Sequence, residues 1–239
     1  MKTFTFNHRI FLLSTCLFVL MSCKDNPKQQ LEATSTPEET QQENTSQDTL
    51  TKGEAYFESG IKAVEANDMP LAFKEFLAAA NEGHDFAQFN VGLMYEQGLG
   101  VNKNPNEAFL WYEKSANQGN SAAQFNLGVS YENGYGTTID YTKANSWYRK
   151  ASLQGDGLAV GNLGMLYIRG QGVEVNKVAG IALLLISATT DTSPQNQAKN
   201  NISATQDLTP EMITEAQNLS QEMSTAENIL IPLDAYLSK

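Results

Sequence analysis

The chain has 239 residues with 27 acidic and 16 basic side chains, a formal net charge of −11 that argues against a nucleic-acid-binding surface. Its apolar fraction of 41% is typical of a globular protein. Both cysteines, Cys16 and Cys23, lie near the N-terminus, and His84 is the only histidine beyond residue 10, which argues against a disulfide scaffold, a zinc site or a Ser-His-Asp triad. We therefore expect no catalytic residue, no metal and no cofactor.

Residues 1–22 are predicted to be a secretory signal peptide. A basic start precedes an apolar run over 10–21, which is too short to cross a hydrocarbon core of about 30 Å. The run ends in Leu20-Met21-Ser22-Cys23, which resembles a bacterial lipobox. The resemblance implies cleavage before Cys23 and lipid on its sulfur. The alternative is ordinary cleavage that leaves Cys23 as a free thiol.

Residues 23–50 are predicted to be a lipidated, disordered tether. No aromatic residue and no glycine occurs between 24 and 50, and the segment is rich in Gln, Asn, Ser and Thr. Such a segment cannot bury enough apolar surface to offset the entropy of ordering it.

The rest of the chain is organised by a 36-residue repeat. Shifting the sequence by this offset superimposes alanines, glycines and tyrosines in three consecutive units. The aligned positions are Ala87, Ala123 and Ala159; Gly92, Gly128 and Gly164; Tyr95, Tyr131 and Tyr167; Gly98, Gly134 and Gly170; and Gly100, Gly136 and Gly172.

Each unit is predicted to form two antiparallel helices. The first covers about 85–96 and ends at the Gly98-x-Gly100 loop, where glycine permits positive φ. Asn104-Pro105-x-Glu107 then has the pattern of a helix start with a capping box. Glycine inside the first helix, as at Gly92, costs about 1 kcal/mol relative to alanine, so we expect a neighbouring helix to approach closely there.

Three conspicuous features have structural interpretations. His84 occupies the position of Asn120 and Asp156, at a turn between units. Trp111-Tyr112 and Trp147-Tyr148 recur at the repeat period, which favours packing between helices over a ligand-stacking surface. No strand precedes the Gly-x-Gly loops and no P-loop motif follows them, so a nucleotide site is not expected.

The motif Ala-Gln-Phe-Asn-x-Gly-x-x-Tyr-Glu-x-Gly-x-Gly occupies 87–100 and again 123–136, and Ala-x-x-Trp-Tyr-x-Lys occupies 108–114 and 144–150. These motifs resemble the Sel1-like repeat, a relative of the tetratricopeptide repeat. The resemblance implies an all-α fold, a right-handed superhelical solenoid of helix pairs.

The implied divisions are one tetratricopeptide-like repeat over 51–84, three Sel1-like repeats over 85–192, and C-terminal capping helices and tail over 193–239. Ser193-Pro194 and Thr209-Pro210 each look like the start of a capping helix.

In tetratricopeptide-type superhelices the first helix of each pair lines the concave face. Carried over to this chain, the resemblance implies that face as the partner-binding site. Its residues are Phe89, Asn90, Leu93 and Glu96; Phe125, Asn126, Val129 and Glu132; and Asn162, Met165 and Arg169. The three asparagines share one position, so they form either an amide ladder for an extended peptide or bonds to a neighbouring helix.

Together with the lipobox, the resemblance implies a non-catalytic protein-binding or scaffold lipoprotein of the bacterial cell envelope. Lys24, directly after Cys23, favours the outer membrane, facing the periplasm, because inner-membrane retention is associated with aspartate at this position. Its partner is then another envelope protein or a delivered toxin. The chief alternative is an immunity protein that neutralises a secreted antibacterial effector. A more distant one is an enzyme that binds or hydrolyses β-lactams, as cysteine-rich relatives do, but this chain has no cysteine inside a repeat.

Overall fold

The computed structural model describes residues 51–239, so the predicted signal peptide, Cys23 and the tether lie outside the described residues. Over this range the chain forms eleven helices and no strand, which confirms the predicted all-α fold. The helices are α2 (Lys52–Glu65), α3 (Met69–Asn81), α4 (Asp85–Gln97), α5 (Pro105–Asn117), α6 (Ser121–Asn133), α7 (Tyr141–Ser152), α8 (Gly157–Arg169), α9 (Lys177–Thr190), α10 (Ala198–Ala204), α11 (Pro210–Thr225) and α12 (Leu230–Leu237).

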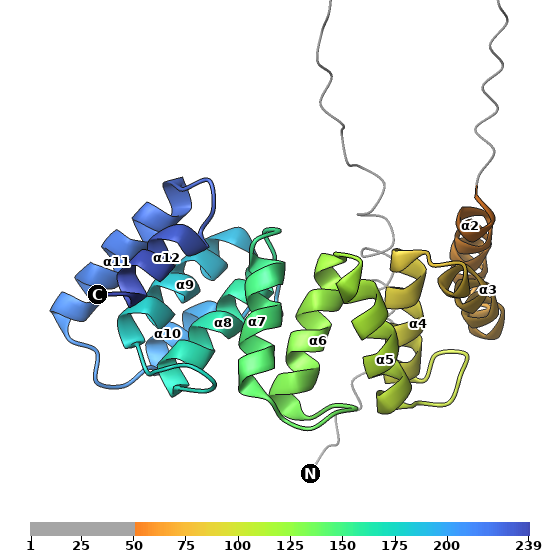
Figure 1. Cartoon of the computed structure of the whole chain (residues 1–239), viewed down its shortest axis with the longest axis horizontal. Coiled ribbons are helices and arrows are strands. Elements are labelled where there is room, and N and C mark those ends of the chain that lie inside the picture. The colour runs from red at the N-terminus through yellow and green to blue at the C-terminus, as the bar shows by residue number, and fades with distance from the viewer. Residues whose placement is uncertain (1–50) are drawn as a thin grey trace, which may run out of the picture. The chain divides into compact units, whose positions relative to one another are not determined.

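From α2 to α9, helices pack in the order in which they occur in the chain (Figure 1). The pairs α2/α3, α4/α5, α6/α7 and α8/α9 each form a helical hairpin, and the second helix of each pair also packs on the first helix of the next. We refer to α2, α4, α6 and α8 as first helices and to α3, α5, α7 and α9 as second helices. Because each unit contacts its neighbours, one apolar core extends from α4 to α12.

Side chains next to the helices fix where the helices begin. Each of the first helices α4, α6 and α8 starts at a side chain that accepts a hydrogen bond from the backbone N–H three residues later. These caps are His84, Asn120 and Asp156. The second helices α5, α7 and α9 start in the same way at Asn104, Asp140 and Asn176.

The capping box predicted at Asn104 is only half formed. The Asn104 side chain accepts from the backbone N–H groups of Asn106 and Glu107. Its own backbone N–H, however, donates to the carbonyl oxygen of Tyr95 at 2.8 Å. That bond closes the loop between the two helices, so it replaces the one that a Glu107 side chain would have made.

The loop glycines serve two purposes. Gly98 ends α4 in the left-handed conformation, with φ of 75°. Gly100 has φ of 67°, and a Cβ built on it would lie 2.1 Å from the carbonyl oxygen of Met69, at the start of α3. The loop of one unit therefore touches the second helix of the preceding unit, which explains why glycine recurs at this position.

The predicted close approach at the mid-helix glycines is confirmed, and in the first two Sel1-like repeats the approaching group is an aromatic ring. A Cβ on Gly92 would lie 2.7 Å from the Tyr112 ring, and one on Gly128 would lie 2.6 Å from the Tyr148 ring. Both tyrosines are almost fully buried. A side chain larger than hydrogen would therefore displace a ring that has no free space to enter.

The C-terminal region differs from the prediction at one of its two helix starts. Ser193-Pro194 does not begin a helix: the Asp191 carboxylate accepts the Ser193 backbone N–H and holds a turn. The Asn196 side chain spans the carbonyl oxygens of Ser187 and Asp191, and α10 starts only at Ala198. The prediction at Thr209 is confirmed, since its hydroxyl accepts from the Met212 backbone N–H at the start of α11.

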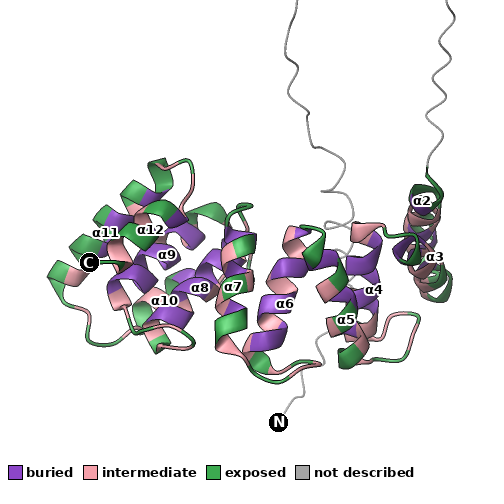
Figure 2. Cartoon of the chain, viewed as in Figure 1, coloured by how far each residue is buried: buried purple, intermediate pink, exposed green. Residues whose placement is uncertain are grey.

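Helix α9 is buried along almost its whole length (Figure 2), because α8 covers it on one side and α10, α11 and α12 also pack on it. The outer face of α11 is polar, as expected of a helix that caps a solenoid. Among residues 51–239, no helix has the length and hydrophobicity needed to cross a membrane.

Candidate functional site

The eleven predicted contact residues all lie on α4, α6 and α8, and we call this set the first-helix face. They differ in accessibility. Phe89 and Asn90 are buried, with 6% and 5% of their surface exposed, so a partner reaches only their edges. Arg169 is exposed, and the other eight are partly buried. For Phe89 and Asn90, burial in the fold corrects the expectation of an open contact position.

The three asparagines do not act alike. The Asn90 amide donates to the carbonyl oxygen of Phe86, one turn earlier in its own helix, at 2.9 Å. The Asn162 amide donates to the Tyr148 hydroxyl of α7 at 3.1 Å. Both amides are thus used within the fold, which favours the structural alternative for these two positions.

The two phenylalanines of the face pack on the tyrosines of the second helices. Phe89 lies 5.9 Å from Tyr112 and Phe125 lies 6.0 Å from Tyr148, measured between ring centroids. Phe125 is only partly buried, so part of it remains accessible. It is the better of the two as a contact for a partner.

Each of the two glutamates accepts a short hydrogen bond from a buried tyrosine. The Tyr112 hydroxyl donates to Glu96 Oε2 and the Tyr148 hydroxyl to Glu132 Oε2, both at 2.6 Å. Burial, followed by the nearby Glu132 charge, raises the pKa of Tyr148 far above its usual value. The tyrosine therefore remains a hydrogen-bond donor, and the carboxylate is held in place at the end of the first helix.

We number the three Sel1-like repeats from the first, α4/α5, to the third, α8/α9. The third repeat has an apolar pair in place of this polar one. Ile168 occupies the position of Glu96 and Glu132, and Leu184 that of Tyr112 and Tyr148. Both members of the pair change together, because a buried tyrosine hydroxyl without an acceptor costs about 1–3 kcal/mol.

A cationic side chain lies beside Glu132. The Arg169 guanidinium, at the end of α8, is 3.7 Å from Glu132 Oε1, the oxygen that Tyr148 does not use. The carboxylate of the second repeat is therefore contacted on one side by a hydroxyl and on the other by a cation, and the contacts come from two different helices.

The carboxylate of the first repeat opens onto a cavity instead. Glu96 and Tyr112 line a space of about 290 Å³ between the first and second repeats. The other residues that line it are Lys103, Pro105, Ala108, Ser130 and Tyr135. Tyr135 is 57% exposed, so it offers an accessible aromatic ring at this space.

His84 and the tryptophans have the structural roles that the sequence indicated. His84 Nδ1 accepts from the Ala87 backbone N–H, and the imidazole stacks on Phe57 at 4.3 Å. Burial lowers the pKa of His84, which favours the neutral ring that this bond requires. Trp111 is buried and Trp147 partly buried, and each carries a lysine ammonium over its ring, 3.6 Å and 3.7 Å from the centroid.

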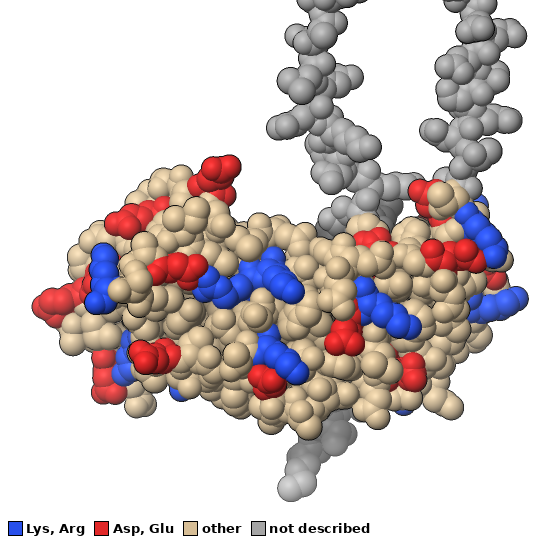
Figure 3. Space-filling view, viewed as in Figure 1, with Lys and Arg blue, Asp and Glu red and all other residues tan. Residues whose placement is uncertain are grey.

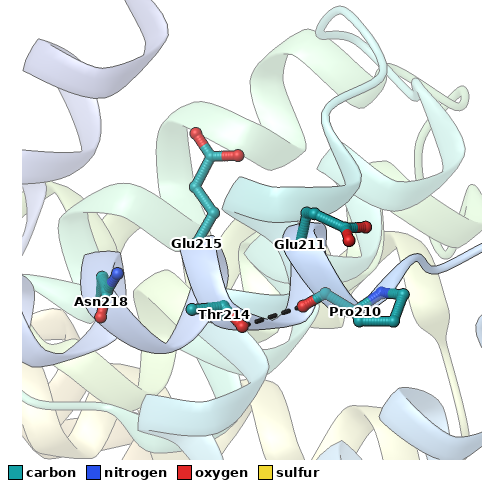
Figure 4. Close-up of a pocket in the computed structure, with 5 residues that line it drawn as sticks. All are labelled: Pro210, Glu211, Thr214, Glu215 and Asn218. Atoms are coloured by element: carbon teal, nitrogen blue, oxygen red, sulfur yellow. Dashed lines mark hydrogen bonds between the residues drawn. The ribbon is translucent and has the colours of Figure 1, made fainter.

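Two other surfaces offer less. A shallow hollow on α11 is lined by Pro210, Glu211, Thr214, Glu215 and Asn218, all from that single helix (Figure 4). Charged side chains are scattered over the face in Figure 3 without forming a large patch of one sign. Within residues 51–239, no three His, Cys, Asp or Glu side chains are grouped as metal ligands would be.

Sequence reasoning identified the glutamates but assigned Tyr112 and Tyr148 to packing alone. A signal for their polar role is present in the repeat, since the Glu–Tyr pair becomes Ile–Leu as a unit in the third repeat. The Glu132–Arg169 contact carries no such signal, because it occurs only once.

The sequence and the fold both match known proteins. The Sel1 repeat family model matches residues 85–120, 121–156 and 158–189. A Sel1 repeat protein from Oxalobacter formigenes has a similar structure, with a TM-score of 0.57 and 30% identity over 70% of each chain. A protective antigen of uropathogenic Escherichia coli with an SLR fold gives a TM-score of 0.56 and 28% identity, over 77% of this chain and 44% of the antigen.

Curated relatives match shorter segments. The chitin synthase regulator SKT5 of Saccharomyces cerevisiae is 39% identical over 61 residues, which is 26% of this chain. The DAP3-binding cell death enhancer 1 of Rattus norvegicus is 44% identical over 48 residues, or 20% of this chain. Each match spans only 9% of the relative, so the similarity concerns the repeats and not the whole proteins.

Proposed function

The chain belongs to the Sel1 repeat family, and on that premise we propose that it is a non-catalytic binding or scaffold protein of the bacterial cell envelope. It holds a segment of another protein on its first-helix face. The Sel1 repeat fold generally serves protein–protein interaction, which supports the broad function. The choice of face rests on the residues described above.

One observation carries this choice. Leu93, Phe125, Val129 and Met165 are apolar, and all four are only partly buried. They lie on α4, α6 and α8 and so extend over three repeats. Glu96, Glu132 and Arg169 add charges of both signs to the same face. Apolar contacts flanked by polar groups are the usual composition of a protein interface.

The proposed interface is tested by site-specific photocrosslinking in cells. A photoreactive amino acid at Val129 or Met165 should yield an adduct of defined mass with one partner. The matched controls are Leu110 and Leu153, which are exposed by 46% and 51% and lie on or just after second helices. Adducts from the control positions alone would place the interface elsewhere and overturn the proposal.

The attachment to the envelope is a separate part of the proposal. A lipid on Cys23, followed by a tether over 24–50, would hold the repeats near a membrane. Cells grown with an alkyne fatty acid should label the wild-type chain and not Cys23→Ser. Equal labelling of both would contradict lipidation at this cysteine and leave the proposed interface unaffected.

A further inference from the structure

The first and second repeats contain equivalent glutamates in different surroundings. Glu96 and Glu132 are equivalent, and each accepts a 2.6 Å hydrogen bond from the tyrosine of its second helix. Glu132 also has the Arg169 guanidinium 3.7 Å from its second carboxylate oxygen. The second repeat thus shows within the same chain which chemical group this arrangement accepts.

The cation is missing from the first repeat. The position equivalent to Arg169 is Asn133, whose amide donates to the carbonyl oxygen of Val129 in its own helix at 3.0 Å. Asn133 carries no charge, so it cannot replace the guanidinium on Glu96. Lys103 lines the cavity next to Glu96, but it is exposed and forms no ion pair with Glu96 in the described part of the chain.

Two residues beside Glu96 are also smaller than their equivalents in the second repeat. The cavity of about 290 Å³ beside Glu96 is lined by Pro105 and Ser130. The equivalent residues of the next repeat are the much larger Tyr141 and Leu166. The loss of bulk and the loss of the arginine therefore occur at the same place.

We propose that Glu96 binds the guanidinium group of an arginine side chain supplied by a partner protein, in the place that Arg169 takes on Glu132. The proposal rests on the proposed function, since the arginine belongs to the segment held on the first-helix face. Arginine fits better than lysine because its planar fork matches a carboxylate. The accessible ring of Tyr135 adds an aromatic surface on which a guanidinium can stack.

The negative charge of the chain favours a basic ligand in a second way. The formal net charge of −11 attracts a cationic segment at long range and speeds its association. The carboxylate of Glu96 then selects the side chain at short range, where Tyr112 already holds one of its oxygens.

The test uses the full chain and two probes, an acetylated and amidated Gly-Arg-Gly peptide and the same peptide with citrulline. NMR titration should show binding of the arginine peptide and none of the citrulline peptide, which has the same shape without the charge. Glu96→Gln retains an acceptor for the Tyr112 hydroxyl, and it should weaken binding by about tenfold or more.

Two further variants make the assignment specific. Asn133→Arg copies the second repeat and should block the site by placing an internal guanidinium on Glu96. Glu113→Gln makes the same change of net charge on α5, outside the lining of the cavity, and should bind as the wild type does. Unchanged binding by Glu96→Gln, or equal binding of citrulline, would overturn the proposal.

Failure here is distinguishable from failure of the proposed function. If Val129 still crosslinks to a partner while Glu96→Gln leaves arginine binding unchanged, the interface stands and only the arginine site is wrong. If the arginine peptide binds as expected but only Leu110 and Leu153 crosslink, the site is real and the proposed interface is wrong.

Discussion

The first two repeats and the third form the same crossing of two helices, but the contact is polar in the first two and apolar in the third. In α4/α5 and α6/α7, a tyrosine ring lies over a glycine and its hydroxyl bonds a glutamate. In α8/α9, two glycines face each other, and a Cβ on Gly164 would lie 2.8 Å from the carbonyl oxygen of Gly180. Ile168 and Leu184 replace the polar pair.

The difference does not lie in burial. Leu184 is fully buried like Tyr112 and Tyr148, and Ile168 is partly buried like the two glutamates. The helices themselves cross more closely in the third repeat: a Cβ on Gly92 would lie 3.3 Å from the carbonyl oxygen of Ala108, and one on Gly164 would lie 2.8 Å from that of Gly180. The apolar pair therefore accompanies the closer crossing, and the tyrosine ring the wider one.

Removing the buried ring should produce the largest effect on this comparison. Tyr148→Ala leaves a void over Gly128 and should lower the free energy of unfolding by about 4 kcal/mol. Leu184→Ala, the equivalent change in the third repeat, should cost about 3 kcal/mol because a smaller side chain is lost. Urea unfolding followed by far-UV circular dichroism measures both. A smaller cost for Tyr148→Ala than for Leu184→Ala would contradict the central role of the ring.

A larger side chain at the mid-helix glycine should also have a different stability cost in the second and third repeats. Gly128→Leu must displace the Tyr148 ring and should cost about 2 kcal/mol. Gly164→Leu meets the backbone carbonyl of Gly180, which cannot rotate away, so its cost should be greater. Thermal midpoints of the two variants provide the comparison. Equal midpoints would show that displacing the Gly180 carbonyl costs no more than displacing the Tyr148 ring.

Transplanting the third repeat into the second tests whether the pairs are interchangeable. A Cβ on Gly180 would lie 2.5 Å from the Ile168 side chain, whereas the equivalent position in the second repeat is Ala144. The double change Glu132→Ile with Tyr148→Leu should therefore destabilise the chain, and adding Ala144→Gly should restore about 1 kcal/mol. This gain should appear although glycine is a poorer helix former than alanine. Further loss on adding the glycine would refute the steric coupling.

The smallest expected effect concerns the helix caps, where the first repeat has His84 and the later ones have Asn120 and Asp156. Burial holds the folded-state pKa of His84 below its usual value of 6.5, so the unfolded chain binds more protons between the two values. Stability should be complete above about pH 6.5 and decrease as the pH falls below it, since protonated Nδ1 cannot accept from Ala87. His84→Asn should retain a cap and lose this pH dependence. A histidine-like pH profile in the variant would assign the effect to another group.

Much of the fold could be predicted because its determinants are local. The 36-residue period, the caps at Asn104 and Asp140 and the glycines that end α4 and α6 each depend on a few neighbouring residues. The mid-helix glycines signalled a close approach because glycine is otherwise unfavourable there. The C-terminal helix starts were harder: Thr209 acts through its own third neighbour, whereas the turn at Ser193 depends on the Asn196 amide reaching back to α9.

The sequence by itself determined which residues share a position in the repeat, because identical local patterns adopt identical local structure. It could not determine how far each is buried, since burial depends on helices that are distant in the chain. Phe89 and Asn90 repeat as Phe125 and Asn126, yet only the first two are buried. The contact of Arg169 with Glu132 and the cavity beside Glu96 likewise involve residues of two units. These differences arise from packing between units, and only the tertiary structure decides them.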